Sequence, residues 1–170
     1  MEQTHATPRP AIAGPLVLEP EAALKAIRKR SFATIATASS EGRPHSAGVL
    51  YALSGDRLYV STMRSSRKAR NIIENAHVAV TIPVRRVPVG PPSSIIFQAT
   101  ARVVGLDDPR LRAAAATGEL RAVTSHDELE LPGGCFLEIT LPRKVVTYGL
   151  GMSLLSLIRD PMNAAGVAYL

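Results

Sequence analysis

A basic cluster at residues 61–71 carries the side chains with the clearest chemical potential in this chain. Its sequence is Ser-Thr-Met-Arg-Ser-Ser-Arg-Lys-Ala-Arg-Asn, with four cations inside seven residues. The residues before it are typical of a strand and those after it of a helix. The first N–H groups of a helix lack intrahelical partners and lie at the positive end of its dipole, so they attract an anion. We therefore predict a phosphate site formed by Arg64, Arg67 and Lys68, with Ser66 as a helix cap and hydroxyl donor.

The overall charge also indicates an anionic partner. The 170 residues include 20 basic and 14 acidic side chains, a balance that favours phosphorylated small molecules, nucleic acid or acidic membrane surfaces. Nucleic acid is disfavoured because the chain has only three Phe, four Tyr and no Trp for base stacking, and its cations gather at one junction. A membrane is disfavoured because no apolar run reaches about 18 residues. We expect neither partner.

Cysteine and histidine content limits the remaining chemistry. Cys135 is the single cysteine, so no intrachain disulfide forms and a reducing cytoplasmic location is expected. His45, His77 and His126 lack the spacing of metal ligands, and we expect no metal site. The serines fall in no Gly-x-Ser-x-Gly elbow, which argues against a hydrolase triad.

Short β-prone runs separated by turns dominate the pattern. Their spacing of roughly 10 to 12 residues favours an antiparallel barrel, whereas a doubly wound parallel sheet would need a helix between nearly every pair of strands. Strands are predicted over residues 31–38, 44–53, 57–62, 77–83, 95–104, 135–141 and 144–148. Helices are predicted over residues 20–30, 66–76, 107–117 and 153–159.

The chain divides into three parts. Residues 1–18 are rich in proline and are expected to form a flexible arm. Residues 19–150 form the barrel domain. Residues 151–170 make an apolar tail that packs on the barrel or on a dimer partner, covers a substrate pocket as a lid, or contacts a membrane weakly.

Five short segments around the basic cluster follow one another with short gaps. They are Phe-Ala-Thr-Ile-Ala-Thr-Ala at 32–38, Glu-Gly-Arg-Pro-His-Ser at 41–46, Gly-Asp-Arg-Leu-Tyr-Val-Ser-Thr at 55–62, Ser-Arg-Lys-Ala-Arg-Asn-Ile at 66–72 and His-Val-Ala-Val at 77–80. This order resembles the pyridoxamine 5'-phosphate oxidase-like, FMN-binding split β-barrel proteins, and the resemblance covers about residues 30–105. Charge alone favours a solvated basic helix start as the explanation of the cluster, whereas this order of segments favours the phosphate interpretation.

The resemblance implies a mostly β protein, a six-stranded antiparallel split barrel with short flanking helices. It also implies a homodimer that holds FMN at its interface. The strand after the first hairpin would line the flavin ring, the end of the next strand would approach the cofactor, and the Ser-Arg-Lys segment would grip the phosphate. The implied cofactor-binding residues are His45, Ser46, Ala47, Gly48, Val49, Leu50, Ser61, Thr62, Ser66, Arg67 and Lys68, with Arg64 added from the charge argument.

The implied activity is that of a flavin-dependent oxidoreductase acting on a small hydrophobic substrate. The true oxidase ends in a segment bearing Arg and Trp, whereas this chain has no Trp and an apolar end, so oxidation of vitamin B6 is not the expected reaction. One alternative is a reductase using the deazaflavin coenzyme F-420, whose acidic tail would suit extra cations such as Arg85 and Arg86. A second is a non-enzymatic barrel that binds flavin, haem or another tetrapyrrole. No side chain is assigned as catalytic, and His45, Tyr51 and Tyr148 are candidate proton donors.

Overall fold

The computed structural model describes residues 14–84 and 91–170, and this part of the chain is mostly β. It contains ten strands, four α-helices and three short 3-10 turns. The strands are β1 Leu16–Leu18, β2 Phe32–Ala38, β3 Pro44–Leu50, β4 Ala52–Ser54, β5 Arg57–Met63, β6 His77–Pro83, β7 Ser94–Val104, β8 Gly134–Thr140, β9 Lys144–Tyr148 and β10 Ala165–Tyr169. The helices are α1 Pro20–Arg28, α2 Arg67–Glu74, α3 Pro109–Ala116 and α4 Leu154–Arg159, and the 3-10 turns are Arg121–Val123, Glu128–Glu130 and Pro161–Asn163.

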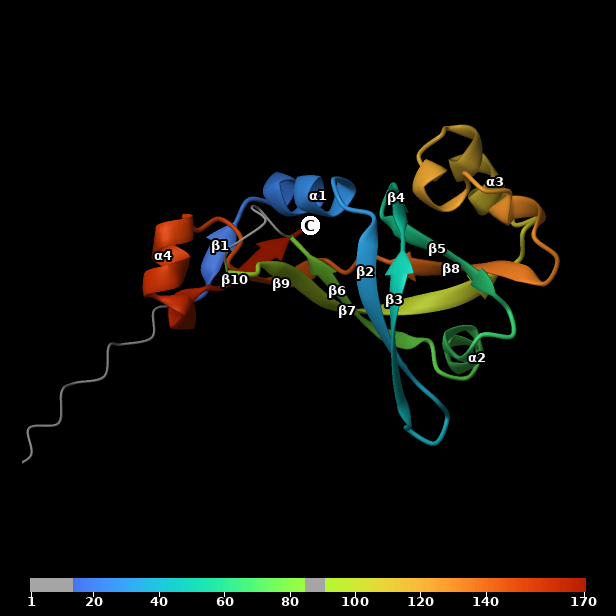
Figure 1. The fold of residues 1–170 in the computed structure, drawn as a ribbon, viewed down its shortest axis with the longest axis horizontal. Helices are drawn as coiled ribbons and strands as arrows, with labels where there is room; N and C mark the ends of the chain where they lie inside the picture. The colour runs from blue at the N-terminus through green and yellow to red at the C-terminus, as the bar shows by residue number, and fades with distance from the viewer. Residues whose placement is uncertain (1–13, 85–90) are drawn as a thin grey trace, which may run out of the picture.

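The sheet is curled and splits along β7 (Figure 1). One path runs in the order β1-β10-β9-β7-β6-β2-β3, and a second leaves β7 through β8 to β5 and β4. The first half of β7 pairs with β6 and β9, and its last four residues pair with β8. All pairings are antiparallel except that of β1 with β10. β7 thus belongs to both halves of the barrel and fixes them relative to each other.

The predicted split barrel is confirmed, but the strand count was wrong, because ten strands are present in the described residues instead of six. One cause is the run at residues 44–53, which the structure divides into β3 and β4 at Tyr51. The Tyr51 ring is buried, its hydroxyl donates to the Ile27 carbonyl at 2.7 Å, and its N–H donates to the Ser31 carbonyl. The chain passes from one sheet to the other at this residue. Tyr51 is a core anchor, and the proposal that it donates a proton to a substrate is wrong.

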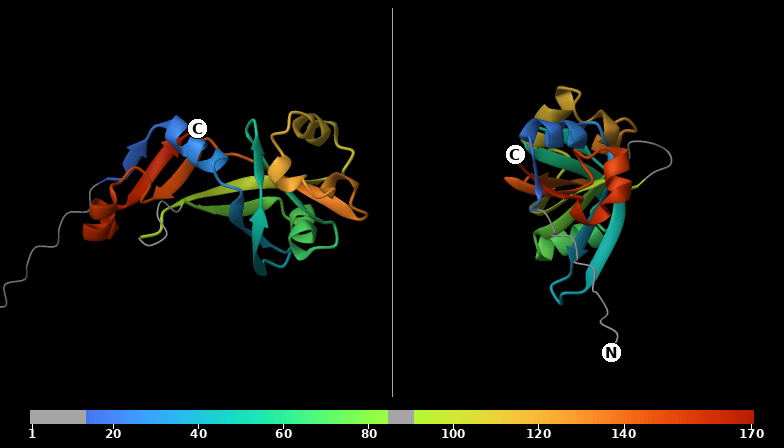
Figure 2. Two further views of the ribbon diagram at one scale, coloured as in Figure 1. Left: turned by 45° about the horizontal axis from the view of Figure 1, so that its top comes forward. Right: turned by 90° about the vertical axis from the view of Figure 1, so that its left-hand side faces the viewer.

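The other added strands lie at the two ends of the chain. Residues 16–18 were expected in a flexible arm, yet they form β1 beside β10. The last residues of the apolar tail form β10, which pairs with β9, and α4 lies at the same end of the molecule, opposite α3 (Figures 1 and 2). Gly166 allows this pairing, because a Cβ there would lie 2.9 Å from the Leu16 carbonyl oxygen. The predicted arm over residues 1–13 and the loop residues Arg85 and Arg86 lie outside the described residues.

Alternation of side chains defines an inner and an outer face. In β2 and β6 every second residue is buried, as in Ala33 and Ile35 of β2, and β7 follows the same alternation less strictly. α1 lies against the barrel through Ala23 and Ile27, both fully buried. Among the described helices, none has both the length and the hydropathy needed to cross a bilayer.

A buried carboxylate ties β5, β8 and β7 together. Glu138 of β8 is 1% exposed, and its carboxylate accepts hydrogen bonds from Tyr59 Oη at 3.1 Å and from Arg57 at 3.1 Å. Arg102 donates to the same carboxylate at 2.8 and 3.0 Å, and it also contacts Asp108, which caps α3. Burial alone would raise the pKa of Glu138, but the hydrogen bonds from Arg102 and Tyr59 and the two positive charges hold that pKa below its usual range.

Candidate functional site

The start of α2 is open to an anion. Ser66 caps the helix, because its Oγ accepts the Ala69 N–H at 3.4 Å, and Thr62 Oγ1 donates to the same oxygen at 3.3 Å. The Ser66 hydroxyl proton therefore remains available as a donor. In residues 14–84 and 91–170, the N–H groups of Arg67 and Lys68 have no hydrogen-bond partner.

The charge of α2 runs against its dipole. The first turn carries Arg67, Lys68 and Arg70 and no acidic residue. Cations at the positive end of a helix are unfavourable, and like charges three residues apart repel. An anion bound at the helix start relieves both effects. Departures from the usual charge pattern of this kind are expected at functional sites.

A cavity of about 260 Å³ lies between β3, β5 and α2. The 3-10 turns that follow α3 contribute a further wall. It is lined by Gly48, Val49, Leu50, Ser61, Lys68, Ala122, Val123 and Glu128. Lys68 is half-buried beside it and brings a positive charge to its wall.

β3 presents an unpaired backbone edge to this cavity. It is the last strand of its path and pairs only with β2 along it. Tyr51 donates its N–H to Ser31, so the hydrogen-bonded pairs between β2 and β3 fall on odd-numbered residues. The N–H and C=O groups of Ser46, Gly48 and Leu50 consequently point away from β2. Gly48 and Leu50 line the cavity, so donors and acceptors alternate along its wall.

Gly48 makes room for an aromatic ring. A Cβ at this position would lie 3.1 Å from two ring atoms of Phe32, which neighbours it across the strand pair. In this structure the ring that lies against Gly48 is therefore that of Phe32. Phe32 was not among the predicted site residues, and its half-exposed ring lies on the outer face of β2 beside Gly48.

The structure brings only part of the predicted site together. Gly48, Val49, Leu50, Ser61 and Lys68 line the cavity. Thr62 and Ser66 are joined to each other at the start of α2. Five other predicted residues are not part of the cavity lining: His45, Ser46 and Ala47 lie nearer the start of β3, Arg64 is exposed after β5, and Arg67 lines a different cavity.

Three residues of the cavity were missed from the sequence. Ala122, Val123 and Glu128 lie more than 50 residues after Lys68, in a polar segment without a recognisable motif. Glu128 is half-buried and accepts the His126 N–H at 2.7 Å. Desolvation raises its pKa, but the backbone hydrogen bonds and nearby His126 outweigh this and hold the pKa below its usual range. Glu128 is therefore a charged acceptor at neutral pH.

Metal chemistry has no evident site in the described part of the chain. No group of three or more His, Cys, Asp or Glu side chains there is arranged to hold a metal ion. The cavity instead offers an ammonium group, a hydroxyl, an unpaired strand edge and one carboxylate. This set suits an elongated organic ligand with an anionic end.

The sequence profile described as pyridoxamine 5'-phosphate oxidase matches residues 19–141, and the chain belongs to this family. A search among curated proteins gives no significant match. The heme storage protein HutZ from Vibrio cholerae is 19% identical with a TM-score of 0.67, and the match covers 79% of this chain and 98% of that one.

Two further solved structures have the same fold. A FAD-binding protein from Mesorhizobium loti is 18% identical with a TM-score of 0.59, and the match covers 74% of this chain and 88% of that one. A pyridoxamine 5'-phosphate oxidase-related, FMN binding protein from Nostoc punctiforme is 16% identical with a TM-score of 0.55, covering 78% and 85%. At these identities the likeness shows a common split-barrel fold.

Proposed function

We propose that this protein binds FMN in the cavity between β3, β5 and α2, at the interface of a homodimer, and acts as a flavin-dependent oxidoreductase. The observation that carries the proposal is the convergence of Lys68, Ser61 and the unpaired edge of β3 on one cavity. An anion-binding helix start lies next to a surface that can hydrogen-bond a heterocycle. FMN has a phosphate at one end and such a heterocycle at the other.

The phosphate end is assigned to the start of α2. Lys68 supplies a charge, the Arg67 and Lys68 N–H groups supply backbone donors, and Ser66 supplies a hydroxyl. Glu128 lies on the same cavity and would repel a phosphate. The phosphate is accordingly placed on the α2 side, and Glu128 is left to accept hydrogen bonds from ligand hydroxyl groups.

The ring end is assigned to the edge of β3. The pyrimidine portion of a flavin carries an N–H between two carbonyl groups, and this pattern matches the alternating acceptors and donors at Gly48 and Leu50. When bound, the flavin supplies hydride-transfer chemistry. The residues of this chain bind and orient it, and Val49, Ala122 and Val123 add an apolar wall to the cavity.

The homodimer is assigned to the outer face of the sheet. The outward residues of β2, β3 and β6 include no Asp, Glu, Lys or Arg, and charge depletion of this kind marks interface cores. This face continues over β7 and β9. Four large apolar side chains on it are 41–57% exposed. They are Phe32, Leu50, Ile96 and Val146, interspersed with small residues such as Ala36, Ala79 and Thr81.

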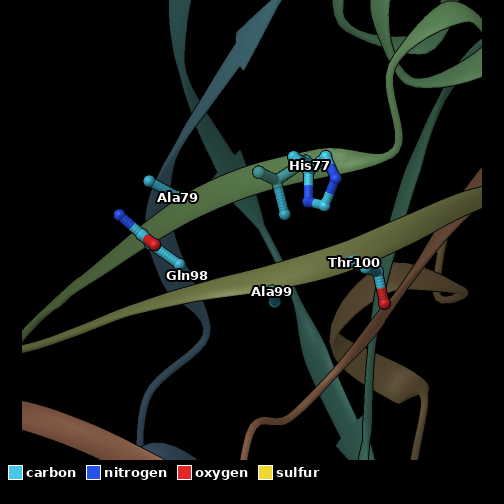
Figure 3. A pocket seen from close by; sticks show the side chains of 6 residues that line it. His77, Ala79, Gln98, Ala99 and Thr100 are labelled. Carbon is cyan, nitrogen blue, oxygen red and sulfur yellow. The ribbon is translucent and has the colours of Figure 1, made fainter.

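A hollow of about 500 Å³ on the same face is open to a partner. It lies over β6 and β7, where His77 stands opposite Thr100 and Ala79 opposite Gln98 (Figure 3). Gly48 and Leu50 belong both to this outer face and to the cavity. A partner on the face therefore borders the ligand, which explains how dimerisation would complete the flavin site.

Replacing Ile96 with aspartate should dissociate the dimer. Ile96 lies within the proposed interface, and an unpaired carboxylate buried there costs several kcal/mol. Light scattering should give twice the chain mass for the wild type and the chain mass for Ile96→Asp. Ile158→Asp, on exposed α4, is the matched control and should stay dimeric. A monomeric wild type would rule out this interface.

Titration of the purified protein with FMN tests the proposed function. Quenching of flavin fluorescence should saturate at one FMN per chain, and the bound flavin should be reduced by a suitable donor and turned over. Parallel titrations with coenzyme F-420 and with haemin separate the alternatives. Saturable haemin binding without FMN or F-420 binding would replace the proposal with a haem-binding function. Flavin binding without turnover with any donor would leave a flavin carrier and refute the oxidoreductase.

A further inference from the structure

The turn that carries Glu128 to the flavin cavity has little packing of its own. Residues 124–133 follow the 3-10 turn Arg121–Val123, and none of them is buried. Asp127 has a φ of 60°, and in residues 14–84 and 91–170 it is the one non-glycine residue with a positive φ. This left-handed conformation is unfavourable for most side chains, so surrounding contacts must maintain it. The position of Glu128 therefore depends on the groups that hold this turn.

Arg112 of α3 joins the turn to the helix. Its guanidinium group donates to the Leu129 carbonyl oxygen at 3.3 Å and to Glu130 Oε1 at 3.1 Å. Its Nε also donates to the Leu106 carbonyl oxygen at 2.6 Å, just before α3. The neighbouring Leu111 is fully buried, so Arg112 projects from a fixed part of the helix. The residues on either side of the turn's centre are thus tied to α3 through one side chain.

α3 is itself fixed to the barrel. Asp108 caps the helix, and Arg102 of β7 donates to Asp108 at 3.4 Å. Arg102 also binds the buried carboxylate of Glu138 at 2.8 Å. A continuous chain of polar contacts therefore runs from the buried carboxylate through α3 and Arg112 to the turn beside the cavity.

Glu128 retains acceptor capacity toward the cavity. Its Oε2 accepts the His126 N–H at 2.7 Å, whereas its Oε1 lies 3.6 Å from His126 Nδ1, beyond ordinary hydrogen-bond reach. A carboxylate can accept about four hydrogen bonds. Glu128 and Lys68 line the same cavity, and among the described residues no ion pair joins them. Two opposite charges on one cavity suit a ligand that has an anion at one end and hydroxyl groups beside it.

We propose that Arg112 is a positioning residue of the flavin site. By holding Leu129 and Glu130 to α3, it keeps the Glu128 carboxylate in the cavity, where Glu128 accepts hydrogen bonds from the hydroxylated chain between the flavin ring and the phosphate. This inference rests on the proposed flavin function. The Arg112 and Glu130 side chains are both partly exposed, so their ion pair adds little to global stability and Arg112 variants should fold.

A double-mutant cycle with two ligands tests the positioning role. Riboflavin carries the hydroxylated chain, and lumiflavin has the same ring with a methyl group in its place. Glu128→Ala should weaken riboflavin binding about tenfold or more and leave lumiflavin binding unchanged. Arg112→Gln should also weaken riboflavin binding alone. The double variant should bind riboflavin no more weakly than Glu128→Ala does, because Arg112 acts through Glu128. Fluorescence titrations measure all four proteins.

Two further variants sharpen the cycle. Arg110→Gln is the matched control, because Arg110 is exposed on the same helix and its side chain has no partner among the described residues. It should bind both flavins as the wild type does. Arg112→Lys keeps the positive charge but cannot reproduce the three contacts of the guanidinium fork, so it should behave like Arg112→Gln.

The outcomes separate this inference from the proposed function. Equal weakening of riboflavin and lumiflavin in Arg112→Gln would overturn the positioning role, and so would additive losses in the double variant. A wild type that binds neither flavin would overturn the proposed function. Exchange of the His126 amide hydrogen in the ligand-free protein then still tests the role of Arg112, because that N–H donates to Glu128. Exchange should be faster in Arg112→Gln than in Arg110→Gln, and equal exchange would overturn the inference.

Discussion

Replacing Glu138 with alanine should lower the free energy of unfolding by about 3 kcal/mol. The carboxylate is fully buried and holds Arg57, Arg102 and Tyr59 at the junction of three strands. Removing one partner of a buried ionic network leaves the others without compensation, and both arginines retain some access to water, which limits the loss. Chemical denaturation followed by circular dichroism measures the change.

A surface carboxylate provides the control for Glu138. Glu130 pairs with Arg112 at 3.1 Å, and its side chain is 72% exposed. Glu130→Ala should therefore cost less than about 1 kcal/mol. If the two variants were equally stable, the buried network would contribute nothing beyond an ordinary surface pair.

The same network predicts how stability depends on pH. The folded pKa of Glu138 is depressed, so its contribution is present above the unfolded value of about 4.3 and is lost as pH falls below it. Burial and Glu138 raise the pKa of Tyr59 to about 12 from 10.0, so stability also declines as pH rises from about 10 to 12. In Glu138→Ala the acid decline should flatten, whereas the alkaline decline should only become smaller, because burial, the larger cause of the Tyr59 shift, remains.

Replacing Lys68 with glutamine should weaken FMN binding by roughly 10-fold to 150-fold. The expected loss is that of one hydrogen bond to a charged group, about 1.5–3 kcal/mol. Riboflavin has the same ring without the phosphate, so its affinity should change by less than about twofold. Fluorescence titrations of both ligands measure the difference.

Lys25→Gln is the matched control for Lys68. Lys25 is exposed on α1 and lines no part of the cavity. FMN and riboflavin should bind this variant as they bind the wild type. An equal loss of both ligands in Lys68→Gln would show that Lys68 supports the cavity as a whole and does not hold the phosphate.

Much of the fold could be predicted from the sequence because its signals are local. Strands were predicted where β2 and β6 lie, and the helices predicted over residues 20–30 and 107–117 correspond to α1 and to α3 with its Asp108 cap. The division of β3 from β4 was not predictable, because it depends on a hydrogen bond from Tyr51 to Ile27, 24 residues away. β1 was missed since it is short and its single strand partner, β10, lies at the other end of the chain, and β10 was missed since it is short and follows an apolar segment broken by Gly and Pro.

The site was predicted where its residues are close in sequence. Ser61 and Lys68 belong to one strand–helix junction, and both line the cavity. Glu128 was missed because only the packing of the segment after α3 brings it to Lys68. Arg67 was grouped with Lys68 because the two are adjacent in sequence. Their side chains leave α2 in different directions, however, and they line separate cavities. Periodicity could have indicated this, since Arg67, Arg70 and Glu74 share one face of α2.

Backbone amide shifts on addition of FMN test the central claim most directly, because the claim concerns where the cofactor lies. We expect the largest changes at Ser46, Gly48 and Leu50, whose N–H groups point from the free edge of β3, and at Arg67 and Lys68 at the start of α2. The N–H groups on the paired side of β3 should change less. Shifts confined to β6 and β7, for example at His77 and its strand partner Thr100, with β3 and α2 unaffected, would contradict this assignment of the flavin site.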